Sequence, residues 1–60
     1  MAEQLSHHSD FLRRMIRIMQ DEQRELDLII LRTPTGQVRE DLTEGNIHLL
    51  AAISALLNVV

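Results

Sequence analysis

The residues of this 60-residue chain with the most reactive side chains are its histidines and their neighbours near the start. His7 and His8 offer two metal ligands, and with Ser9 and Asp10 they supply the residue types of a hydrolytic triad. Adjacent residues of a helix point about 100° apart, so these two histidines face one ion poorly, and neighbours along one helix do not converge on a substrate. We therefore predict a solvated helix surface here and a protein that is not an enzyme, with no catalytic residue, metal or cofactor.

Three arginines near the start form the only basic cluster in the chain. Arg13, Arg14 and Arg17 could contact phosphate groups or a protein partner. Asp10 and Asp21 lie one turn away on either side and cancel much of the positive charge. We favour a solvated face that is also a possible partner surface, and we keep a small DNA-binding regulator that uses these arginines as the alternative function.

Two other titratable features have a functional and a simpler interpretation. His48 would act as a pH switch if an interface buried it, but we favour an exposed or hydrogen-bonded histidine. Residues 21–46 hold seven carboxylates against three arginines. They could dock a basic partner, but we favour a role in solubility.

The composition excludes several classes of protein. Phe11 is the only aromatic residue, so bases of single-stranded nucleic acid have no stacking platform. Six arginines and no lysine against nine carboxylates give a net charge of −3, which argues against duplex DNA. The first ten residues lack the pattern of a secretory signal, and the apolar stretch 47–60 is shorter than the roughly 20 residues that span a bilayer. We therefore expect a cytoplasmic protein that does not bind membranes.

The first half of the chain has the periodicity of one long helix. Apolar residues recur every seven positions at Leu5, Leu12, Met19 and Leu26, and Met15, Ile16, Ile29 and Ile30 fill the offsets between them. We predict a helix over about 6–32, capped by Ser6 or Ser9, with residues 1–5 frayed. It ends at Arg32 because Thr33 precedes Pro34. The polar residue Glu22 interrupts the heptad line between Met15 and Ile29. Such a residue either fixes the register between two packed helices or marks the place where the partner helix crosses away.

The second half predicts a turn and a second helix. Thr33 to Gly36 (TPTG) has the residues of a type I turn, and a polar connector covers 37–41. Thr43 is the expected N-cap of a helix over about 43–60, with Leu42 and Ile47 as a hydrophobic staple. The alternative is a short helix over 37–43 that ends at Gly45, followed by a helix that Asn46 caps.

The second helix is apolar or small around almost its whole circumference. Leu49, Ile53, Leu56 and Val60 form one stripe, and Ile47, Leu50 and Leu57 form another beside it. The first helix can cover one side only, so the remainder requires another chain. We predict a single all-α domain over residues 1–60, a two-helix hairpin that dimerises into a four-helix bundle. These seven residues are the expected dimer interface, and Ala51 and Ala55 permit close approach.

A resemblance suggests a biological context. The segment RTPTGQVREDLTEGNIHLLAAISALL, in a short lysine-free helical chain, resembles small accessory proteins of lambdoid phages, especially those encoded in the early region between the exonuclease and excisionase genes. The resemblance covers about the second half of the chain. It implies a self-associating, early-expressed helical protein that biases development between lysogeny and lysis through host or phage proteins.

These observations predict a non-enzymatic, dimeric interaction or regulatory module. Its expected partners are a second copy and a host or phage protein. Besides the DNA-binding regulator, one further alternative is a membrane-surface peptide anchored by the second helix, although that helix lacks the Lys/Arg face and the Trp or Phe that such anchors use.

Overall fold

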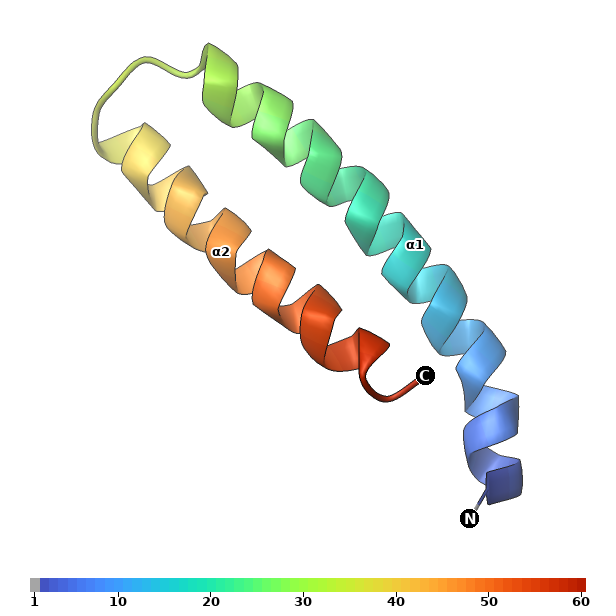
Figure 1. Ribbon diagram of the computed structural model, residues 1–60. Helices are drawn as coiled ribbons and strands as arrows, with labels where there is room; N and C mark the ends of the chain where they lie inside the picture. The colour runs from blue at the N-terminus through green and yellow to red at the C-terminus, as the bar shows by residue number, and fades with distance from the viewer. Residues whose placement is uncertain (1) are drawn as a thin grey trace.

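Two antiparallel helices joined by a short turn make up the protein (Figure 1). The computed structural model describes the backbone of residues 2–60 and the side chains of residues 8–60. Helix α1 spans Ala2–Arg32 and α2 spans Gln37–Leu57. The molecule measures 48 × 15 × 11 Å, so it is a rod one helix pair wide. The predicted all-α hairpin is confirmed.

Helix α1 begins earlier than the sequence suggested and ends where expected. Its first residue is Ala2, so the predicted start near Ser6 or Ser9 is wrong. The fraying of residues 1–5 stays a prediction, and both Met1 and the His7 side chain lie outside the described residues. At the other end Thr33 donates its backbone N–H to the Ile30 carbonyl at 3.1 Å and its hydroxyl to the Ile29 carbonyl at 2.6 Å. These bonds satisfy two carbonyls that the last turn would otherwise leave open.

Helix α2 begins six residues before its predicted start. The Glu40 N–H donates to the Gly36 carbonyl at 3.0 Å, which begins the helical ladder. Thr43 is therefore an interior residue, and its hydroxyl donates back to the Arg39 carbonyl at 2.8 Å. The helix also continues through Gly45, so the alternative of two helices divided there is wrong too. It ends at Leu57, three residues before the predicted end.

The turn depends on Gly36. Its φ of 158° and ψ of −170° lie in a region that only glycine adopts without strain. A Cβ atom at this position would meet nothing within 4 Å, so the requirement comes from the backbone and not from a lack of space.

The two helices meet along a seam with a heptad repeat. Taken from the pattern of half-buried and buried residues, the a and d positions of α1 are Ser9, Leu12, Ile16, Met19, Gln23, Leu26 and Ile30. Those of α2 are Arg39, Leu42, Asn46, Leu49, Ile53 and Leu56, and the half-buried Thr33 and Val60 lie just beyond the ends of the two helices. Among the described residues, Ile16 and Ile53 are the buried hydrophobic side chains, at 3% and 5% exposed. The hairpin therefore has a narrow core.

Glu22 is not the polar member of this seam. It is exposed and belongs to the flanking line that also holds Met15 and Ile29, the latter half exposed. The seam position is the next residue, Gln23, because the repeat follows Ile16 and Ile30 rather than their neighbours. The seam is therefore interrupted by a polar residue, as the sequence indicated, but that residue is Gln23 and not Glu22.

Candidate interaction surfaces

A layer of three polar side chains crosses the middle of the seam. The Asn46 amide donates to Asp27 Oδ1 at 2.8 Å, and the Gln23 amide donates to Asp27 Oδ2 at 2.7 Å and to Asn46 Oδ1 at 3.3 Å. Asn46 is only 8% exposed, whereas the Asp27 carboxylate reaches solvent. Among the described residues every buried side-chain nitrogen or oxygen has a partner. A satisfied polar layer of this kind fixes which residues of two helices face each other.

Sequence reasoning missed this layer although a signal for it was present. Asn46 lies four residues after Leu42 and three before Leu49, which is the spacing of an a position between two d positions. Interpreting Asn46 as a possible helix cap hid that spacing. A count of one heptad back from Ile53 would have placed Asn46 in the seam.

The heptad register also decides which flanking residues share a side of the hairpin. In an antiparallel pair the e positions of both helices flank one side of the seam and the g positions flank the other. The e side holds Arg13, Gln20 and Asp27 of α1 with Thr43, Leu50 and Leu57 of α2. The g side holds Met15, Glu22 and Ile29 of α1 with Val38, Gly45 and Ala52 of α2.

The seven residues predicted to form a dimer interface divide into two groups. Leu49, Ile53 and Leu56 occupy the seam and pack toward α1, and Val60, which follows the end of α2, is half-buried. The other three form an exposed line on the e side of α2, with Ile47 at 59%, Leu50 at 46% and Leu57 at 49% exposed. We call these three the α2 stripe. Within a single hairpin the stripe has no cover.

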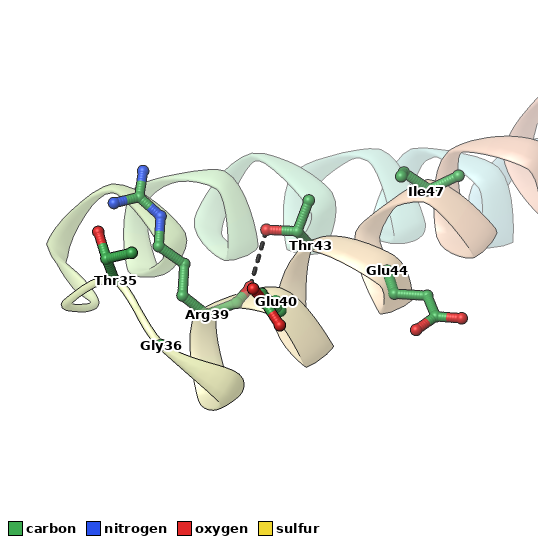
Figure 2. Close-up of a pocket in the computed structure, with 7 residues that line it drawn as sticks. All are labelled: Thr35, Gly36, Arg39, Glu40, Thr43, Glu44 and Ile47. Atoms are coloured by element: carbon green, nitrogen blue, oxygen red, sulfur yellow. Dashed lines mark hydrogen bonds between the residues drawn. The ribbon is translucent and has the colours of Figure 1, made fainter.

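A shallow hollow of about 580 Å³ extends the α2 stripe toward the turn (Figure 2). Ile47 lies at one end of it and Thr35 and Gly36 at the other, with Arg39, Glu40, Thr43 and Glu44 between them. In Figure 2 the Thr43 hydroxyl turns back to its own helix, so this polar group is already satisfied. The hollow mixes one arginine with two carboxylates and shows no convergent set of reactive groups.

A second hollow, of about 420 Å³, lies on the g side of α1. We call it the α1 hollow. It is lined by Phe11, Arg14, Met15, Ile18 and Met19. Phe11 is 58% exposed and Ile18 62% exposed. The only aromatic ring of the chain therefore lies on its surface.

The three arginines of the predicted partner surface lie on the outer, solvent-facing side of α1. All three are exposed. Arg13 occupies an e position, Arg17 a b position and Arg14 an f position, and of the three only Arg14 lines the α1 hollow. Among the described side chains none of the three makes an ion pair, and Asp21, expected to offset Arg17, pairs with Arg24 at 3.0 Å. Arg14 is therefore the one of these three arginines that lies beside the exposed apolar residues of the α1 hollow.

The candidate catalytic and titratable residues lie apart from any enclosed site. His8 and Asp10 are exposed, and Ser9 is half-buried at the end of the seam. His48 is exposed, 3.9 Å from the Glu44 carboxylate, as the favoured interpretation held. Over the side chains described, no three His, Cys, Asp or Glu residues gather as metal ligands.

Comparison of the chain with protein-family models, curated proteins and solved structures finds no match. Within residues 2–60, neither helix combines the length and apolar character needed to cross a membrane. The two apolar surfaces and the polar layer are therefore the features from which a function is inferred.

Proposed function

We propose that this protein is a non-enzymatic interaction module that works as a homodimer, two hairpins forming a four-helix bundle. The observation that carries this proposal is the excess of exposed surface on the single hairpin. Its solvent-accessible area is 4913 Å². A compact monomer of 6.9 kDa is expected to expose about 4000 Å².

The excess of about 900 Å² is close to what one partner contributes to a stable interface, about 800 Å². The hairpin buries about half of the surface of its unfolded chain, against about 60% for a compact domain of this length. A second copy of the chain is present wherever the protein is made, so it is always available as a partner. Dimerisation would thus supply the apolar burial that a core of two buried hydrophobic side chains, among the residues described, does not provide.

The α2 stripe is the face that we propose for the dimer contact. Between Gly45 and Val60 the chain carries no Asp, Glu, Lys or Arg, so the outer face of α2 can approach another helix without burying a fixed charge. Ala51, Ser54 and Ala55 lie among the stripe residues and are small enough to permit close packing.

The biological setting is part of the same proposal. We propose a cytoplasmic regulatory protein of the kind found in the early regions of lambdoid phages, acting on the balance between lysogeny and lysis through a host or phage protein. The support for this is the resemblance of residues 32–57 and the absence of any convergent reactive groups among the described side chains. The alternative of a DNA-binding regulator is weakened because nine carboxylates outnumber the six arginines of the chain.

Sedimentation equilibrium tests the dimer. We expect the chain to sediment at twice its 6.9 kDa mass at micromolar concentration, and its thermal midpoint to rise with protein concentration. Leu50→Asp and Leu57→Asp should each dissociate and unfold the protein together. Ile18→Asp is the matched control, because it places the same charge at another exposed apolar residue, 62% exposed and away from the α2 stripe, and should sediment as wild type.

A wild-type chain that sediments as a monomer, with a midpoint independent of concentration, would refute the dimer. A dimer that tolerates both stripe substitutions but dissociates in Ile18→Asp would instead place the contact on the other side of the hairpin. The concentration dependence of the wild-type midpoint keeps the test informative even if both stripe variants fail to fold.

A further inference from the structure

We propose that the α1 hollow is a docking site for an amphipathic helix of another protein that carries carboxylates beside its apolar stripe. The inference goes beyond the proposed dimer and does not depend on it. It rests on three observations: the apolar lining of the hollow, its position relative to the α2 stripe, and the local charge.

The apolar lining has the dimensions of a helix-binding groove. Phe11, Met15 and Ile18 are spaced four and three residues apart, so they form a line two turns long on one face of α1. A partner helix would lay its own i, i+3, i+4 and i+7 side chains along such a line. The volume of about 420 Å³ is within the range of specific binding clefts, and two methionines give the lining an adaptable surface.

The hollow remains open in the proposed dimer. Met15 occupies a g position, whereas Leu50 and Leu57 occupy e positions, so the two apolar surfaces flank opposite sides of the seam. A second hairpin on the α2 stripe would therefore leave the α1 hollow free for a different partner.

The local charge selects an acidic partner. Residues 8–19 hold three arginines and one aspartate, in a chain whose net charge is −3. Arg14 lines the hollow itself and makes no ion pair among the described side chains. A second copy is a poor occupant, because its own exposed stripe lies in the segment 45–60, which has no carboxylate side chain to offer Arg14. A helix of another protein with Glu or Asp beside its apolar residues would match both the apolar lining of the hollow and the positive charge of Arg14.

Binding of designed peptides to the full chain tests the inference. The probe is a dye-labelled helical peptide with leucines at i, i+3, i+4 and i+7 flanked by glutamates, and the comparison peptide replaces the glutamates with lysines. By fluorescence anisotropy we expect the glutamate peptide to bind at least about tenfold more tightly. Arg14→Glu should weaken its binding by about tenfold, since an attraction becomes a repulsion, and Ile18→Asp should abolish it.

Arg13→Glu is the matched control, because it makes the same charge change at the neighbouring residue, whose side chain does not line the α1 hollow. It should alter the affinity of the glutamate peptide by less than about twofold, the size expected of an exposed charge that is screened by salt and makes no direct contact with the peptide. Circular dichroism of each variant confirms that the helices are retained.

The outcomes separate this proposal from the others. Equal binding of the two peptides, or equal effects of Arg13→Glu and Arg14→Glu, would overturn the acidic-helix proposal. Binding to vesicles of anionic lipid with the same dependence on Ile18 would assign the hollow to a membrane surface and also overturn it. If the wild-type chain proves monomeric yet binds the glutamate peptide through Arg14, the dimer fails and this inference stands.

Discussion

Replacing Asn46 with alanine removes the centre of the polar layer. Its bond to the Asp27 carboxylate is 2.8 Å long, and a bond to a charged group contributes about 1.5–3 kcal/mol. Its bond with Gln23, at 3.3 Å, is weaker and adds about 0.5 kcal/mol. Water can reach Asp27 and restores part of this loss, so we expect a net destabilisation of about 2 kcal/mol, or a fall in thermal midpoint of about 10 °C.

Urea unfolding followed by circular dichroism at fixed protein concentration measures this loss. Gln37→Ala is the matched control, because its amide also donates to a carboxylate, that of Asp41, at 2.8 Å, but on an exposed face. We expect it to cost less than about 0.5 kcal/mol. If Asn46→Ala is as mild as this control, the polar layer does not hold the two helices together.

The double substitution Gln23→Leu with Asn46→Leu tests whether the layer provides specificity rather than stability. Each leucine adds apolar burial to the seam, so we expect the double variant to be more stable than wild type by about 2 kcal/mol. It should also lose its single register and sediment as a mixture of species. A double variant with unchanged stability and one sharp oligomeric state would refute this role.

Further predictions concern the turn, the core and the surface. Gly36→Ala should cost about 1–3 kcal/mol by urea unfolding, because its backbone conformation suits only glycine. Gly45→Ala should stabilise by about 1 kcal/mol in the same assay, since the new Cβ meets nothing within 4 Å inside a helix. Ile53→Ala should cost about 2–4 kcal/mol by chemical unfolding because Ile53 is 5% exposed. Arg24→Ala, which removes only an exposed ion pair, should change the free energy of unfolding by less than about 0.5 kcal/mol.

The long-range architecture could be predicted from the sequence because its causes are local. Thr33 before Pro34 ends α1, and the absence of Gly and Pro before that point leaves one uninterrupted helix. The start of α2 could not be placed in the same way. Gly45 suggested a boundary, but packing of Leu42, Leu49 and Asn46 along the seam outweighs the roughly 1 kcal/mol that an interior glycine costs.

The candidate surfaces were predictable in part. The two apolar stripes of α2 could be predicted from residue spacing alone. One of them, which contains Leu49, Ile53 and Leu56, packs in the seam of the hairpin. Which residues of α1 remain exposed depends on the register between the helices, and a shift of one residue exchanges Ile16 for Met15. The polar layer sets that register through contacts 19 and 23 residues apart in sequence, which local patterns do not report.

The two ends of the hairpin differ in what lies near them. The C-terminus lies beside the N-terminal half of α1, at the end away from the turn (Figure 1). An affinity tag, a dye or a fused domain attached to the C-terminus would therefore stand near the α1 hollow and compete with anything that binds there. Thr35, in the turn at the far end, is the position where a label leaves the hollow accessible.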